Sequence, residues 1–225
     1  AWTRSPSDYF LITDDHTREG LITRNLPKEK MNITGFPVSP RFESLEKVSP
    51  DDPLNPFRIL FFPTARSPHV TDIIKAALSH ENHITVILGR NVRRLYRKVY
   101  SLKKSFPGRI HIKGWTRKVP ELLSSHHLVI GKAGGATVHE AIAAQCPMLV
   151  HHIVPGQEEG NIELLDRFQT GSLATSAKTI RESISNLLDD DAALWREQKN
   201  RLSQHARPSA ARDAANFILS KVKPS

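Results

Sequence analysis

The sequence predicts an α/β fold, a Rossmann-like doubly wound parallel sheet. From Phe57 onward, short apolar runs alternate with helical patterns. Two polar segments that carry glycine each follow such a run and lead into a helix. Hydrophobic residues make up 39% of the 225 residues, enough for a packed core. Strands that alternate with helices predict a parallel sheet that is covered on both faces.

The expected elements follow in order along the chain. Strands are expected at residues 57–62, 83–88, 109–112, 128–130, 148–150 and 172–174. Helices are expected at 69–80 and 91–105, and after the strands at 128–130 and 148–150. The pattern is helical from Ala177 to the end, with a break at Arg207–Pro208 because proline interrupts a helix.

Four segments are predicted along the chain. Residues 1–36 contain one expected strand, Tyr9–Ile12, and one short helix, too little to bury a core, so they predict a remnant of another domain. Residues 37–56 hold five prolines and predict an extended interdomain linker. Residues 57–206 form the α/β domain, and 207–225 a C-terminal helix. The chain starts without methionine, so we expect a piece of a longer protein.

Lys and Arg number 32 against 23 Asp and Glu, which gives a formal charge of +9. Nucleic acid, an anionic membrane surface, an anionic substrate or a plain basic surface would each explain this charge. An RNA-binding domain is suggested by charge alone, because no basic strand rich in aromatic residues is present. The basic run 90–104 is typical of a solvated helix face, and it also suits anionic lipid. No apolar stretch reaches the ~18 residues of a membrane-spanning helix.

Cysteine and histidine point to no metal site. The single cysteine, Cys146, excludes an intramolecular disulfide framework and is expected in the core. Eleven histidines include the adjacent pairs His126–His127 and His151–His152, which lack the spacing of metal ligands. We therefore expect structural histidines.

The candidate ligand-binding residues lie mainly in two segments, Gly131–Glu140 and Pro155–Asn161. In the first, a strand passes through adjacent glycines into a helix N-terminus, where backbone N–H groups and the helix dipole favour phosphate. A plain tight turn is the alternative for this segment alone. The second segment opens the next helix. Both lie at the carboxyl edge of the predicted sheet, where ligands bind in open α/β sheets.

These two segments resemble glycosyltransferase family 28, especially the plant monogalactosyldiacylglycerol synthases and the bacterial processive diacylglycerol glucosyltransferases. The Pro-Gly-Gln-Glu-x-x-Asn pattern at 155–161 is typical of this subgroup. Thr34–Val38 resembles the hinge between the two halves of these enzymes, and Asp8–Phe10 the last strand of the N-terminal half. The resemblance covers residues 8–221 and implies the C-terminal half of a GT-B enzyme, with 57–206 as its nucleotide-sugar-binding domain.

The resemblance also implies the site residues. The nucleotide-binding residues would be Gly114, Trp115, Thr116, Gly134, Gly135, Ala136, Thr137 and Glu140. The sugar-binding residues would be Pro155, Gly156, Gln157, Glu158 and Asn161. Amides at 134–136 would hold the diphosphate and the loop at 114–116 the uracil. Glu140 would accept the ribose hydroxyls, Gln157 and Glu158 would contact the hexose, and Asn161 the sugar or diphosphate.

Each of these residues also has a purely structural interpretation. Glu140 fits a solvated helix position, Trp115 fits packing in a core, and Glu159 simply complements the helix dipole. One departure from the family lies in the loop Phe62–Pro68, which has no glycine. Either Arg66 and Ser67 contact phosphate there through their side chains, or this loop has lost its role.

The function implied by the resemblance is inverting transfer of a hexose from a UDP-sugar to a lipid acceptor such as diacylglycerol. The UDP-sugar is a co-substrate, and no metal or other cofactor is expected. The expected partners are the UDP-sugar, the lipid acceptor and an anionic membrane surface, without nucleic acid. The protein would be cytoplasmic and peripheral on the inner face of a membrane. The catalytic base would lie in the N-terminal half, so these residues alone would be incomplete.

Two alternatives remain open from the sequence. One is N-acetylglucosaminyl transfer to a lipid-linked or lipopolysaccharide acceptor. The other is a non-catalytic or split-subunit nucleotide-sugar-binding domain.

Overall fold

The computed structural model describes residues 6–64 and 69–222. The chain divides into two compact units. Unit 1 combines residues 1–44 with 207–225, and unit 2 comprises residues 45–206. The boundary at 44/45 falls within the predicted linker, and the boundary at 206/207 falls at the predicted helix break. The assignment of these segments to domains stays a prediction.

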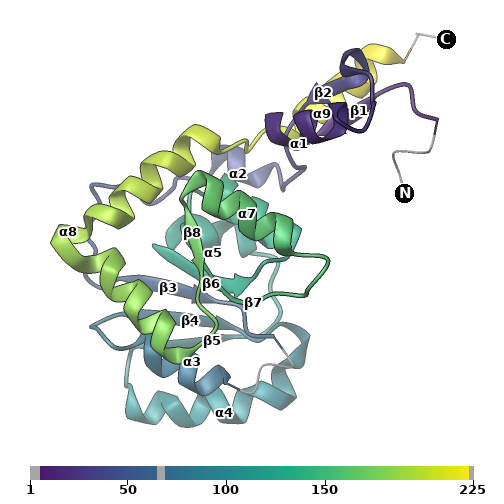
Figure 1. Cartoon of the computed structure of the whole chain (residues 1–225). Helices are drawn as coiled ribbons and strands as arrows, with labels where there is room; N and C mark the ends of the chain where they lie inside the picture. Colours follow the sequence, from purple (N-terminus) through teal and green to yellow (C-terminus); the bar gives the residue numbers. More distant parts are fainter. Residues whose placement is uncertain (1–5, 65–68, 223–225) are drawn as a thin grey trace. The chain divides into compact units, whose positions relative to one another are not determined.

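Unit 2 is built on a six-stranded sheet in which every neighbouring pair of strands is parallel (Figure 1). Its strands are β3 (Arg58–Phe61), β4 (His83–Ile87), β5 (Ile110–Lys113), β6 (Leu128–Lys132), β7 (Met148–His152) and β8 (Gly171–Leu173). All six were predicted. Their order is β5-β4-β3-β6-β7-β8, so the direction of winding reverses between β3 and β6. In such a sheet, ligands bind outside the carboxyl ends of the strands at this reversal.

In the described part of unit 2, five α-helices connect successive strands, and a sixth, α8, follows the last strand. They are α3 (Val70–Ala77), α4 (Val92–Ser105), α5 (Val119–Ser125), α6 (Gly135–Ala143), α7 (Glu159–Phe168) and α8 (Ala177–His205). α3 packs beside α4, and α6 beside α7. Right-handed crossovers that leave the reversal in opposite directions place these two pairs on opposite faces of the sheet. The seven-residue helix α5 was not predicted.

α8 is bent, as Figure 1 shows. Residues 189–192 leave helical geometry, and Asp190, Asp191 and Ala192 have positive φ. The first part of α8 packs on α3. In the second part, Trp195 Nε1 donates to the His127 carbonyl at 2.7 Å, and Lys199 Nζ donates to the Gln145 carbonyl at 2.7 Å. The two parts of α8 therefore contact different regions of unit 2. The first part packs on α3, and the second part bonds to residues just before β6 and β7.

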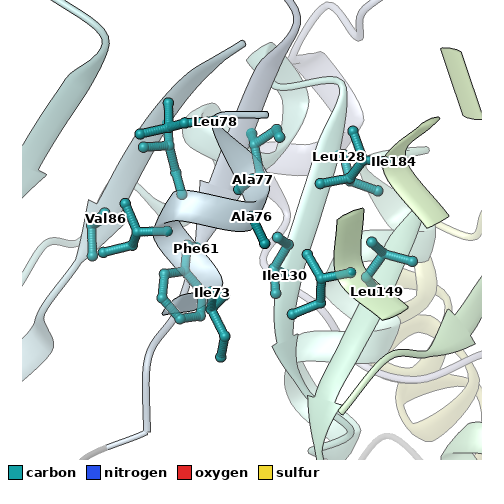
Figure 2. Close-up of a cluster of buried hydrophobic side chains, with 14 of the residues drawn as sticks. Phe61, Ile73, Ala76, Ala77, Leu78, Val86, Leu128, Ile130, Leu149 and Ile184 are labelled. Carbon is teal, nitrogen blue, oxygen red and sulfur yellow. The ribbon is translucent and has the colours of Figure 1, made fainter. Parts of the chain in front are cut away.

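The core of unit 2 lies between the sheet and its helices (Figure 2). Its members include Phe61 and Ile130 from the central strands, Ile73 from α3 and Ile184 from α8, all at most 2% exposed. Each such side chain contributes roughly 1.5–3 kcal/mol by leaving water. Cys146 is also buried, as the sequence predicted.

Unit 1 contains a two-stranded parallel sheet, β1 (Phe10–Ile12) and β2 (Met31–Ile33). Its helices are α1 (Asp15–Ile22), α2 (Arg41–Ser44) and α9 (Ala210–Lys221). Only β1 and α1 were predicted before residue 37, so β2 was missed. Residues 37–56 are not wholly extended, because α2 lies within them. α8 ends at His205 and α9 begins at Ala210, which confirms the predicted break.

No helix within residues 6–64 and 69–222 combines the length and the apolar character needed to cross a membrane.

Candidate functional site

The β6–α6 loop presents an open helix N-terminus at the carboxyl edge of the sheet. β6 ends at Lys132, and α6 begins at Gly135 with Gly134 as its N-cap. The first helical hydrogen bond runs from Val138 N–H to the Gly134 carbonyl at 3.0 Å, and no described side chain caps this end. The amides of the first turn are therefore available to an anion.

Two carboxylates of the β7–α7 loop accept hydrogen bonds from backbone N–H groups of the same loop. Glu158, the N-cap of α7, accepts a hydrogen bond from Val154 N–H through Oε2 at 3.0 Å. Glu159 accepts from Gly156 N–H through both oxygens, at 2.9 and 2.8 Å. Gly156 has φ +79°, a conformation that favours glycine. Pro155 and Gln157 are exposed at the tip of this loop.

Two side-chain contacts tie these loops together. Lys132 Nζ lies 2.6 Å from Glu158 Oε1, and Asn161 Nδ2 donates to the Ala133 carbonyl at 2.8 Å. The Lys132 side chain is 47% exposed, whereas that of Glu158 is 6% exposed. The strand register shifts here, because Gly131 pairs with Val150 but Lys132 pairs with His152. Such irregularities redirect side chains next to binding sites.

The sequence motifs did not single out Lys132. Its position as the last strand residue before two glycines was the available signal, since that places a cation beside the expected anion site. Among the predicted residues, the structure brings Gly134 and Glu158 together around this lysine: a Cβ on Gly134 would lie 3.1 Å from Lys132 Nζ and 3.5 Å from Glu158 Oε1. Asn161 joins the same pair of loops through its contact with Ala133.

The two acidic site residues differ in their electrostatics. Burial by itself raises the pKa of Glu158, but hydrogen bonds from Lys132 and from Val154 N–H outweigh it and lower the pKa below its usual value. Burial raises the pKa of Glu140, which lies within α6 and is partly buried. In the part of the chain that the structure describes, the Glu140 carboxylate has no hydrogen-bonding or charged partner. Glu140 therefore has unused acceptor capacity.

The loop Gly114–Thr116 follows β5, which β4 and β3 separate from β6. Trp115 is 57% exposed, so the packing interpretation is wrong. The Arg117 guanidinium lies 5.5 Å from the centre of the Trp115 ring, and Thr116 Oγ1 accepts from Lys118 N–H at 3.0 Å. An exposed indole next to a cation offers a flat surface to a ring-shaped ligand.

Arg66 and Ser67 lie outside the described residues. On the described side of their loop, His151 Nε2 lies 3.4 Å from the Phe62 carbonyl oxygen. This contact links the carboxyl ends of β7 and β3 at the reversal point of the sheet.

Three of the four paired histidines, His126, His127 and His151, are buried, whereas His152 is exposed. His126 contacts the Leu122 carbonyl at 2.6 Å and Thr85 Oγ1 at 2.9 Å, and burial lowers its pKa to about 4. His127 Nδ1 accepts from Arg58 N–H at 2.7 Å, and burial lowers its pKa to about 3. Within residues 6–64 and 69–222, no three His, Cys, Asp or Glu residues gather as a metal site would require.

No family model matches the chain. Curated relatives do: the chain is 25% identical over 217 residues to the processive diacylglycerol β-glucosyltransferases of Bacillus pumilus and of Bacillus subtilis. In both cases the match covers 93% of this chain and 56% of the relative. The chain thus spans little more than half the length of these relatives.

Solved structures share the fold. Anabaena HepE in complex with UDP and glucose is 15% identical, with a TM-score of 0.57 over 96% of this chain and 64% of that one. WaaG, a glycosyltransferase involved in lipopolysaccharide biosynthesis, is 16% identical, with a TM-score of 0.56 over 96% and 64%. The UDP-GlcNAc 2-epimerase from Neisseria meningitidis is 15% identical, with a TM-score of 0.69 over 96% and 61%.

The predicted fold class is thereby confirmed, since the parallel six-stranded sheet matches that of GT-B glycosyltransferases. At these identities the structural likeness establishes the fold alone, and the epimerase shares that fold with the transferases. This chain is a homologue of the processive diacylglycerol glucosyltransferases, and it has the fold of GT-B glycosyltransferases.

Proposed function

We propose that the chain is the donor-binding part of an inverting glycosyltransferase, which moves a hexose from a UDP-sugar to a lipid acceptor such as diacylglycerol. The observation that carries the proposal is the uncapped N-terminus of α6 at the reversal point of the sheet, beside the cation of Lys132. That arrangement suits a diphosphate. The names of the sequence relatives support the reaction and the acceptor.

The residues have distinct proposed roles. The first-turn amides of α6, at Gly135, Ala136 and Thr137, bind the diphosphate. Glu140 accepts the ribose hydroxyls, and the exposed tip of the β7–α7 loop faces the hexose. In the reaction, the acceptor oxygen attacks the anomeric carbon, the bond from that carbon to the phosphate oxygen breaks, and UDP keeps the electron pair. The acceptor proton passes to a base outside the residues assigned here.

Two alternative functions, N-acetylglucosaminyl transfer and a non-catalytic donor-binding subunit, can be distinguished by the sugar that is transferred and by whether any transfer occurs. Transfer of N-acetylglucosamine to a lipid-linked acceptor uses the same donor site, so donor competition with UDP-glucose and UDP-N-acetylglucosamine distinguishes the sugar. A non-catalytic subunit binds the donor but leaves diacylglycerol unmodified. The assay is transfer to diacylglycerol in vesicles by the protein that contains this chain.

UDP binding without metal tests the donor site. We expect calorimetric titration to show saturable binding of UDP in EDTA, because amides and Lys132 supply the positive charge. Glu140→Gln should weaken UDP about ten-fold or more, since a hydrogen bond to a charged group contributes about 1.5–3 kcal/mol. Glu163→Gln, on the exposed side of α7, is the matched control and should bind as the parent does. A folded protein that shows no saturable UDP binding would contradict the donor-site assignment.

We also propose that α4 contacts an anionic membrane surface. Its described charged side chains are all basic, and no acidic residue lies within residues 92–105. Tyr96 and Tyr100 are 41% and 46% exposed and stack with their ring centres 5.3 Å apart. Exposed tyrosines among cations are typical of a helix at a lipid interface. The exposed cations are Arg93, Arg97, Lys98, Lys103 and Lys104.

Vesicle binding tests this surface. The triple variant Arg97→Gln/Lys98→Gln/Lys104→Gln should bind anionic vesicles at least ten-fold more weakly, because each cation near such a surface contributes about 1 kcal/mol. The control variant Arg167→Gln/Lys178→Gln/Arg181→Gln removes the same charge from α7 and α8 and should bind as the parent does. Sedimentation with vesicles at low and high salt measures both. Equal binding to neutral and anionic vesicles would rule out this contact.

A further inference from the structure

We propose that Lys132 is the cation that stabilises the leaving diphosphate, and that Glu158 is the residue that positions it. This role rests on the proposed function. It assigns Lys132, which the sequence motifs did not single out, and it gives Glu158 a positioning role in place of the hexose contact that the resemblance implied. Glu158 is 5% exposed, and both of its oxygens are occupied: Oε1 by Lys132 and Oε2 by Val154 N–H. A carboxylate held in this way fixes the ammonium group that it contacts.

The ammonium group faces the anion site. A Cβ built on Gly134 would lie 3.1 Å from Lys132 Nζ, so the ammonium lies against the N-cap residue of α6. The glycine leaves that space free for the lysine. The cation and the uncapped amides of the first turn therefore act at one place, and both favour negative charge.

The lysine retains capacity for a ligand. An ammonium group has three N–H donors, and among the described residues Glu158 is the one partner of Lys132. The lysine side chain is half exposed while its carboxylate partner is buried, so the pair opens toward solvent on the cation side. A pair that served only to join the two loops would have no need for this exposed cation.

The charge has a defined use in the reaction. When the bond between the anomeric carbon and the phosphate oxygen breaks, that oxygen gains the electron pair and the diphosphate becomes more negative. A cation already fixed near this oxygen stabilises the charge without reorganisation. Glu158 provides this fixation before the donor binds, because its hydrogen bond to Val154 N–H holds the carboxylate in place.

Comparing UDP with uridine isolates the phosphate contact. We expect Lys132→Met to weaken UDP about ten- to hundred-fold. Uridine, which lacks phosphate, should bind the variant within about two-fold of the parent. Glu158→Gln should weaken UDP by a smaller factor and also spare uridine. The double variant should bind UDP no more weakly than Lys132→Met alone, because Glu158 acts through the lysine. Titration calorimetry on the 225-residue chain measures all four proteins.

Lys178→Met removes the same charge from an exposed position on α8 and should leave both affinities unchanged. Equal UDP affinity in the parent and in Lys132→Met would overturn the role of the lysine while leaving the donor site in place. Loss of UDP and uridine by equal factors would show a purely structural pair. If the parent itself binds no UDP, the proposed function fails first. Should Lys132→Met not fold, the ratio of UDP to uridine affinity in Glu158→Gln decides, and an unchanged ratio overturns the proposal.

Discussion

Trp195→Ala is expected to lower the free energy of unfolding of unit 2 by about 3–5 kcal/mol, because a large aromatic side chain is removed from a fully buried site. Trp195 is fully buried, and its indole N–H donates to the His127 carbonyl at 2.7 Å. Its ring meets Phe57 edge to face, with the ring centres 6.2 Å apart. The truncation leaves a cavity and an unsatisfied carbonyl between α8 and the sheet.

Equilibrium unfolding in urea, followed by circular dichroism, measures the effect. Trp115→Ala is the matched control, since it makes the same substitution at a 57% exposed position. We expect it to cost less than about 1 kcal/mol, the scale of an exposed contact between a cation and an aromatic ring. A loss for Trp195→Ala no larger than about 1 kcal/mol would show that the α8 contact does not stabilise the unit.

Gly171→Ala is expected to destabilise unit 2 by at least about 1–3 kcal/mol, the usual cost of overpacking. A Cβ on Gly171 would lie 2.4 Å from the Met148 carbonyl oxygen, and Met148 pairs directly with Gly171 between β7 and β8. A backbone carbonyl cannot yield as a flexible side chain can. The edge strand β8 must therefore move away from β7.

Gly160→Ala provides the opposite case, because nothing lies within 4 Å of the added Cβ and the position is helical. Alanine there should stabilise the protein by about 0.4–1 kcal/mol, since it restricts the unfolded chain. Thermal unfolding of both variants gives the comparison. A change of the same sign in the two proteins would contradict this account of the glycine positions.

The sheet of unit 2 was predictable from the sequence because its buried strands are continuous apolar runs between helical patterns. β2 (Met31–Ile33) was not, since three half-buried residues give no periodic signal and their pairing with β1 is non-local. The bend at Asp189–Ala192 was not predicted either, although its three consecutive aspartates were an available signal. Aspartate has a low helix propensity and tolerates positive φ.

Part of the candidate site was predictable from the sequence, and part was not. The loops with Gly134 and Glu158 were predictable, because their glycines and acids follow apolar strands. The pair of Lys132 and Glu158 was not, since its members are 26 residues apart and meet only when β6 and β7 align. The exposure of Trp115 was also beyond the sequence, because a tryptophan after a strand fits either a core or a surface.

Unit 1 is assembled from both ends of the sequence, and this has a consequence for synthesis on the ribosome. Tyr9 packs on Phe217 with the ring centres 5.2 Å apart, and Glu43 pairs with Arg212 at 2.5 Å. The N-terminal part of unit 1 therefore lacks α9 until residues 45–206 have been synthesised. At a synthesis rate of about 5–20 residues per second, this interval lasts on the order of ten seconds or more. During that time Tyr9 and Glu43 lack their partners on α9, while the residues of unit 2 are already complete.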